Sequence, residues 1–361
     1  MKKLMPIYGA LLLSLIVLFP LIFPTPSCAD VKTIPKLTVS PIPKKLLTIS
    51  ITYRKLKEYR FGHDYYSSLN SMPLFMTFDP PNILFTLNEF KFISSFYINK
   101  LDFISGSYDL NGFRPNYPFT YRLPADPHAY TRYGGGQSPD SGQNPYGIAL
   151  DNNYLYVADY ARKALEIYDK ARGLEPGGLP KKEIGSPAFT DHLKGVAVAG
   201  NNLYVIEGSK IAKFNLSSDA SGPILSGKTV CQLPLNSPRA IAATVDPLTG
   251  KDMVYLIVSG KVQKITNFSI PFGPYLSNPE LPFNNPSALA IDPITGYIYV
   301  SDTGNKQVQV FNRDGSFKGR FGTLNGPLGI AAYNNFVFVG LSIPNDPRID
   351  DPEIVLYQIS E

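Results

Sequence analysis

Basic side chains recur at a regular position in this 361-residue sequence and are the residues best suited to chemistry. In four successive segments they occupy a short polar stretch between two apolar runs. These residues are Arg162, Lys163, Lys210, Lys261 and Lys306. Lysine and arginine bind anionic groups through charge-assisted hydrogen bonds. The pattern predicts one surface that recognises an anion, and the alternative is a plain preference for polar residues in turns.

Two longer segments are further candidates for partner contact. Residues 342–353, "SIPNDPRIDDPE", form an acidic loop around Arg348 that is too long for a plain turn, and residues 106–128 are rich in Tyr, Phe, Pro and Arg. Specificity residues concentrate in such excess loops. We expect a protein or an acidic glycan as the partner, whereas a nucleic acid is a poor match because the net charge is mild and stacking residues are not clustered.

Two aspartates, Asp159 and Asp302, each end an aromatic and β-branched run and precede a turn. A carboxylate at such a position accepts hydrogen bonds from neighbouring backbone N–H groups and fixes the loop. We interpret both as structural residues of the turns, not as catalytic residues.

The N-terminus has the pattern of a signal peptide over residues 1–29. Two lysines precede the apolar run Leu11–Phe23, and small residues precede a cleavage position after Ala29. Lipoprotein processing at Cys28 and an uncleaved membrane anchor are the alternatives, and membrane contact is expected only through this segment. We therefore expect an exported protein of the periplasm, the cell envelope or the extracellular space, and the oligomeric state stays open.

Composition describes an ordinary folded chain, with 44% hydrophobic and 17% charged residues. Without residues 1–29 the chain has 32 basic and 29 acidic residues, a formal charge of +3, and a single cysteine, Cys231. An intrachain disulfide is then excluded, so the core must supply the stability. Cys231 is predicted to be a small buried apolar residue.

The sequence repeats itself. Small residues recur at intervals of 48, 45, 48 and 41, at Gly147, Gly195, Ala240, Ala288 and Gly329. Each unit reads as a strand rich in small residues, an aromatic and β-branched strand, and an alternating strand, with traces of a fourth, outer strand. Four-stranded sheets repeated every 40–50 residues are typical of a β-propeller.

Two units, residues 144–170 and 285–322, resemble NHL repeats closely. Both contain an Asn-Pro start, a strand like "SALAID", a strand like "YIYVSD" and a third strand like "VQVF". The resemblance implies an all-β, six-bladed propeller of four-stranded antiparallel blades. Residues 144–361 supply five units, and residues 66–135 are expected to form a degenerate blade with an insertion at 106–128 and its outer strand at 129–134.

The last unit ends at Glu361 directly after its third strand. An open strand edge there would favour aggregation. We predict that residues 46–56 supply the missing strand and close the ring, after a proline-containing leader at 30–45. The propeller then spans residues 46–361.

Enzymes with similar propellers define the alternative to a binding module. A gluconolactonase-like hydrolase would hold calcium at the axis through oxygen ligands, for which Asn144 and Asn285 are the best placed. The aspartates that follow first strands, Asp151, Asp246 and Asp292, lie at the wrong end. An amidating-lyase-like enzyme would need zinc, yet the three histidines do not occupy equivalent positions; they are His63, His128 and His192. We therefore expect a non-catalytic binding or scaffolding module without a cofactor, with the metal-dependent enzyme as the second candidate.

Overall fold

The computed structural model divides the chain into two units, Met1–Leu47 and Thr48–Glu361. It describes residues of the second unit alone, namely 51–59, 71–80, 83–90, 95–102, 120–122, 145–170, 181–233, 238–266, 273–322, 325–342 and 354–360. The expected signal peptide and leader lie outside these residues, as do His63, His128, Asn144 and Arg348. In the described ranges no helix has the length and apolar character to cross a bilayer.

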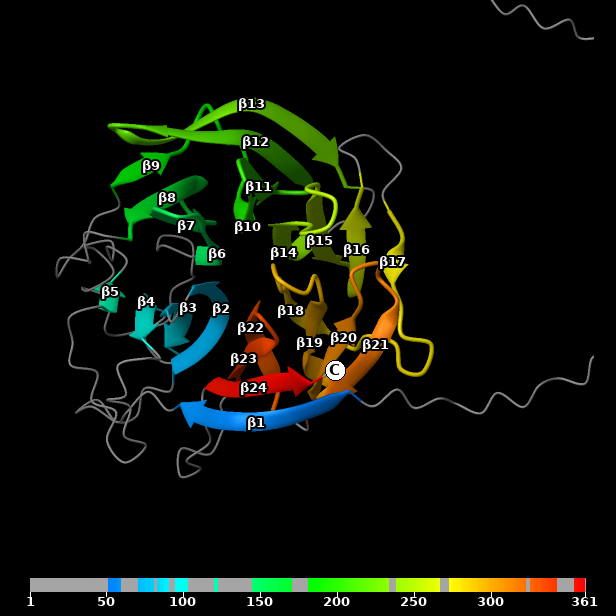
Figure 1. The fold of residues 1–361 in the computed structure, drawn as a ribbon. Helices are drawn as coiled ribbons and strands as arrows, with labels where there is room; N and C mark the ends of the chain where they lie inside the picture. The colour runs from blue at the N-terminus through cyan, green and yellow to red at the C-terminus, as the bar shows by residue number, and fades with distance from the viewer. Residues whose placement is uncertain are drawn as a thin grey trace, which may run out of the picture. The chain divides into compact units, whose positions relative to one another are not determined.

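The described chain forms six four-stranded sheets, which we call blades 1 to 6 (Figure 1). Blade 1 contains β2 (Ser71–Asp79), β3 (Ile83–Phe90), β4 (Ser95–Asp102) and β5 (Thr120–Arg122). Blade 2 contains β6 (Pro145–Leu150), β7 (Tyr154–Asp159), β8 (Ala164–Asp169) and β9 (Lys182–Ile184). Blade 3 contains β10 (Leu193–Ala199), β11 (Asn202–Glu207), β12 (Lys210–Asp219) and β13 (Gly222–Gln232).

The C-terminal half continues the same order. Blade 4 contains β14 (Pro238–Val245), β15 (Asp252–Val258), β16 (Lys261–Ile265) and β17 (Tyr275–Leu276). Blade 5 contains β18 (Pro286–Ile291), β19 (Ile298–Asp302), β20 (Gln307–Phe311) and β21 (Phe317–Phe321), with the 3-10 helix η2 (Thr303–Asn305) between β19 and β20. Blade 6 contains β22 (Pro327–Tyr333), β23 (Phe336–Leu341), β24 (Ile354–Ser360) and the N-terminal β1 (Thr52–Tyr59).

The first strands of the blades form a closed circuit around a common centre. Each contacts the next, from β2 through β6, β10, β14 and β18 to β22, and β22 contacts β2 again. Figure 1 shows these strands innermost and the later strands of each blade farther out. The prediction of an all-β, six-bladed propeller of four-stranded antiparallel blades is confirmed.

The second strands are buried because each blade packs against a neighbour on both faces. All six residues of β7 and all five of β19 are buried. One cluster joins Tyr156 and Leu165 of blade 2 to Val205 of blade 3. Aromatic and β-branched residues fill such sites well, which explains why each unit has its strongest apolar run in its second strand.

β1 pairs antiparallel with β24, from Thr52 opposite Ser360 to Tyr59 opposite Ile354. The strand begins several residues later than the expected 46–56. Arg54 Nη2 donates to Gln358 Oε1 at 3.0 Å across the pair. That this pairing holds the ring closed stays a prediction.

The prediction that residues 129–134 form the outer strand of blade 1 is wrong. The outer strand is β5, Thr120–Arg122, which pairs with β4 inside the stretch expected as an insertion. A three-residue strand carries too little alternation to be recognised in a sequence. Residues 129–134 themselves lie outside the described residues.

Candidate functional site

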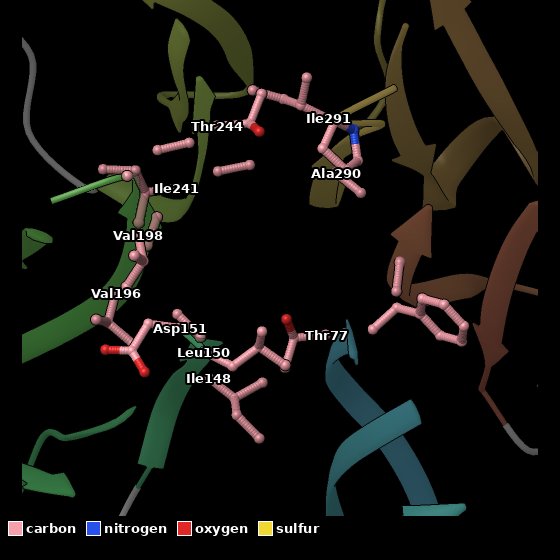
Figure 2. A pocket seen from close by; sticks show the side chains of 18 of the residues that line it. Thr77, Ile148, Leu150, Asp151, Val196, Val198, Ile241, Thr244, Ala290 and Ile291 are labelled. Carbon is pink, nitrogen blue, oxygen red and sulfur yellow. The ribbon is translucent and has the colours of Figure 1, made fainter. Parts of the chain in front are cut away.

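The first strands all run in the same direction along the axis. Their beginnings line a small hollow of about 40 Å³, at residues such as Gly147, Gly195 and Ala288. Their ends line a cavity of about 580 Å³, at residues such as Leu150 and Ile291 (Figure 2). In an antiparallel blade, the turn from the second to the third strand lies at the end where the first strand begins. These turns therefore share one face, which we call the entry face; it comprises turns 160–163, 208–209, 259–260 and 303–306 and the beginnings of the first strands.

Four of the predicted cations lie on the entry face. Lys163, Lys261 and Lys306 are exposed and Lys210 is half-buried. The Lys261 ammonium lies 5.1 Å from the ring centre of Tyr275. With the described acidic residues, none of the four forms an ion pair.

Arg162 is engaged differently. Its Nη1 lies 3.2 Å from Glu183 Oε2 and 3.5 Å from Glu166 Oε1, and its Nε lies 4.0 Å from Asp159 Oδ2. Three carboxylates therefore compete with any external anion for this guanidinium. Glu183 lies on β9, 21 residues from Arg162, and the spacing of the sequence does not indicate that the two side chains meet.

The carboxylates that end the second strands are buried under the entry face. Asp302 Oδ1 accepts a hydrogen bond from the backbone N–H of Asn284 at 2.8 Å, and its Oδ2 accepts from Asn305 Nδ2 and Gln309 Nε2. Asp159 Oδ1 accepts from the backbone N–H of Arg162 at 3.0 Å. These contacts are of the loop-fixing kind expected of both aspartates.

Glu207 occupies the same position in blade 3. It accepts hydrogen bonds from the backbone N–H and hydroxyl of Thr190 and from Lys228 Nζ. Burial raises the pKa of Glu207, but the bonds from Lys228 and Thr190 outweigh it and leave the pKa below its usual value. The acids of this face thus have internal partners, while three of its four lysines are exposed to solvent.

A buried acidic cluster lies beside Arg162. Burial raises the pKa of Glu166 to about 7, against the lowering effect of the hydrogen bond that the Tyr168 hydroxyl donates at 2.7 Å. Burial and the neighbouring Glu166 also raise the pKa of Tyr168. Glu166 is fully buried, so these groups have no route to a ligand and act on stability.

A β-bulge at the beginning of every first strand adds residues that sequence reasoning missed. The register shifts near the start of each first strand, directly after a proline in five strands and after Leu193 in β10. The residues in these bulges are Leu74, Tyr146, Lys194, Arg239, Ser287 and Leu328. In blades 2 to 6 the sequence signal is the variable position between a proline or leucine and a small residue, whereas blade 1 has Phe75 in place of the small residue. An extra bulge residue turns its side chain away from the pleat.

Of the two expected calcium ligands, Asn285 is described and its side-chain oxygen already has a partner. Asn285 has a left-handed backbone (φ 52°), and its Oδ1 accepts a hydrogen bond from Arg239 Nη1 at 2.8 Å. The wall of the larger cavity combines apolar side chains such as Val198 and Ile241 with polar ones such as Asp151 and Thr244 (Figure 2). Among the described residues, no three of His, Cys, Asp and Glu gather into a metal-binding group.

The remaining candidates have structural partners. His192 stacks on Tyr160, with ring centres 4.2 Å apart, and its Nδ1 bonds the Tyr160 carbonyl oxygen at 2.7 Å. Asp292 accepts from the backbone N–H groups of Asn334 and Asn335, which ties blade 5 to blade 6 at the opposite face. Cys231 is a free and buried thiol, as predicted.

Two further aspartates lie in the turns of the opposite face. Asp151 Oδ1 accepts from the backbone N–H groups of Asn153 and Tyr154. Asp246 accepts from the backbone N–H of Leu248 and lies 3.5 Å from Arg313 Nε.

Comparison with known proteins identifies one repeat directly. Residues 283–311 match the model of the NHL repeat. No curated protein matches the sequence.

Solved structures resemble this chain at low sequence identity. The Cps50 (Swd1) β-propeller domain of Myceliophteria thermophila is 9% identical, with a TM-score of 0.48, over 86% of this chain and 100% of that one. A Bacteroides thetaiotaomicron protein of unknown function is 13% identical, with a TM-score of 0.48, over 85% and 76%. A nidogen/laminin complex contains a chain that is 16% identical, with a TM-score of 0.42, over 55% and 72%. At these identities and TM-scores, we draw no functional conclusion from them.

Proposed function

We propose that this six-bladed β-propeller, whose residues 283–311 match the NHL repeat, is an exported, non-catalytic binding module whose entry face holds an anionic partner. Lys163, Lys210, Lys261 and Lys306 supply the charge. The chemistry they recognise is a row of carboxylate or sulfate groups, on an acidic glycan or on an acidic protein segment.

The backbone of two of these lysines is the observation that carries the proposal. Lys163 and Lys306 adopt left-handed conformations, with φ of 53° and 55°. The equivalent turns of blades 3 and 4 place Gly208, and Ser259 with Gly260, in that conformation. A residue with a Cβ costs about 1 kcal/mol there, which glycine avoids. Two exposed lysines at unfavourable backbone positions support a role for their ammonium groups.

The arrangement favours a repetitive ligand. Lysines on four successive blades lie along an arc, so one extended polyanion can meet several of them at once, whereas a single small anion meets one. Exposed charges of this kind act mainly through long-range attraction, which salt screens over about 10 Å at 0.1 M.

Glycine substitution separates binding from folding. The double variant Lys163→Gly and Lys306→Gly relieves two strained residues, so its thermal unfolding temperature stays equal or rises. We expect its affinity for polygalacturonate or poly-L-glutamate to fall by about three- to tenfold at low salt. Titration calorimetry beside thermal unfolding measures both effects.

Lys251→Gln is the matched control, because Lys251 is exposed in a turn of the opposite face. It should leave the affinity unchanged. Equal affinity of the wild type and the double glycine variant for both polymers would contradict the proposal.

A further inference from the structure

We propose, resting on the anionic-partner role above, that the partner is an acidic polysaccharide and that one of its uronate units lies across the axial opening, held by Tyr146, Lys194 and Arg239.

The bulges place these three residues around the opening. Tyr146, Lys194 and Arg239 are the bulge residues of β6, β10 and β14, which are consecutive in the ring of first strands. Bulges redirect side chains out of the pleat and occur frequently beside binding sites. Three neighbouring blades therefore present one aromatic ring and two cations at the same height on the axis.

Tyr146 provides a fixed aromatic surface. The residue is 38% exposed, and its ring packs on Tyr160 with ring centres 5.1 Å apart. Tyr160 in turn stacks on His192, whose Nδ1 is bonded to the Tyr160 carbonyl oxygen. The three rings thus support one another, and the ordering cost on binding is small.

The ring distinguishes a sugar from a peptide. A pyranose has a flat face of C–H groups that packs on an aromatic face, while its hydroxyls stay in water. Aspartate and glutamate side chains carry the same carboxylates without such a flat apolar face. An exposed tyrosine beside two cations therefore fits a uronate better than an acidic peptide.

Arg239 is positioned to bind the carboxylate. One Nη1–H is donated to Asn285 Oδ1 at 2.8 Å, which holds the guanidinium near the junction of blades 4 and 5. Arg239 is exposed, so its other N–H groups can form the paired hydrogen bonds that arginine makes with carboxylates. Lys194, half-buried in the adjacent bulge, adds a second positive charge.

The hollow beneath explains why the polymer lies across the opening and does not enter it. It holds about 40 Å³, room for one or two water molecules, and small residues line it. A Cβ on Gly147 would lie 2.9 Å from the Gly195 Cα, so these strands are already in close contact. A chain end cannot pass between them.

Tyr146 variants test the saccharide part of the inference. Affinities are measured by calorimetry for an oligogalacturonate, for poly-L-glutamate of equal charge and for a single-stranded oligonucleotide. We expect Tyr146→Ala to lower the affinity for oligogalacturonate about tenfold and the affinity for poly-L-glutamate less than twofold. Tyr146→Phe keeps the ring and should change neither affinity. Arg239→Lys keeps the charge but loses the paired hydrogen bonds, and should weaken oligogalacturonate about fivefold.

The outcomes separate this inference from the proposed function. If Tyr146→Ala lowers the affinities for oligogalacturonate and poly-L-glutamate equally, the inference of a polysaccharide partner is wrong. It is also wrong if the wild type binds poly-L-glutamate but not oligogalacturonate. In both cases the anionic-partner role stands. Tighter binding of the oligonucleotide than of oligogalacturonate also overturns the inference of a polysaccharide partner. Absence of binding to all three polyanions overturns both. If Tyr146→Ala lowers the unfolding temperature, the wild-type affinities for oligogalacturonate and poly-L-glutamate decide.

Discussion

Glu166 is the residue whose surroundings differ most from those of an ordinary surface carboxylate. It is fully buried beside the Tyr168 hydroxyl, and burial raises its pKa to about 7 from an ordinary 4.5. Between pH 4.5 and about pH 7, the folded chain therefore holds a proton on Glu166, and the unfolded chain releases that proton. Stability falls with rising pH wherever the folded state holds more protons, so Glu166 destabilises the fold as the pH rises from about 5 to about 7.

The variant Glu166→Gln tests this titration. A neutral amide keeps its hydrogen-bonding groups at all pH values, so the decline in unfolding temperature between pH 5 and pH 8 should become shallower, and the variant should exceed the wild type at pH 8 by a few degrees. Glu280→Gln changes an exposed carboxylate of another blade that does not act on Glu166, and it should keep the wild-type slope. A pH profile of Glu166→Gln parallel to that of the wild type would refute the raised pKa.

β1 and β24 are the pair of strands that we predict to hold the ring closed. They belong to opposite ends of the sequence, and the Arg54–Gln358 side-chain bond joins residues 304 positions apart. Tyr53 lies over Phe321 and Tyr357, with ring centres 5.3 and 5.9 Å away, so β1 also contacts blade 5. Without β1, the last described strand of blade 6 would have an unpaired edge.

Cysteine cross-linking tests the closing pair. Arg54→Cys with Gln358→Cys places two thiols opposite each other, and we expect a spontaneous disulfide that raises the unfolding temperature by several degrees, since it closes a loop of about 300 residues. Cys231 is buried and does not compete. Tyr53→Cys with Gln358→Cys is the control, because neighbouring residues of a strand point to opposite faces. Equal oxidation of the two pairs would show that β1 does not hold this register.

How far the sequence predicts these elements depends on their length and pattern. The spacing from Gly147 to Ala288 and the apolar second strands predict blades 2 to 5 because burial on both faces demands that composition. β5 escapes prediction because three residues carry no periodicity. The bulges are not predicted, because one extra residue leaves the alternation of apolar and polar residues on either side intact. The sequence therefore does not identify Lys194 and Arg239 as residues of the opening.

The whole propeller presents two different ends. The entry face carries lysines, three of them exposed, over buried carboxylates. The opposite face surrounds a cavity of about 580 Å³ lined by both polar and apolar residues, and it exposes Leu248 and Ile294 at its turns. The repeat predicts which lysines share a face, because equivalent turns of a ring lie at one end of the axis. It does not predict the engagement of Arg162, which depends on a contact with Glu183.

Lysine footprinting measures most directly whether the entry face is the binding surface. Amine acetylation is quantified by mass spectrometry with and without polygalacturonate, at low salt. We predict protection of Lys163, Lys210, Lys261 and Lys306 and unchanged labelling of Lys251 on the opposite face. Protection of Lys251 with continued labelling of the four entry-face lysines would contradict the account.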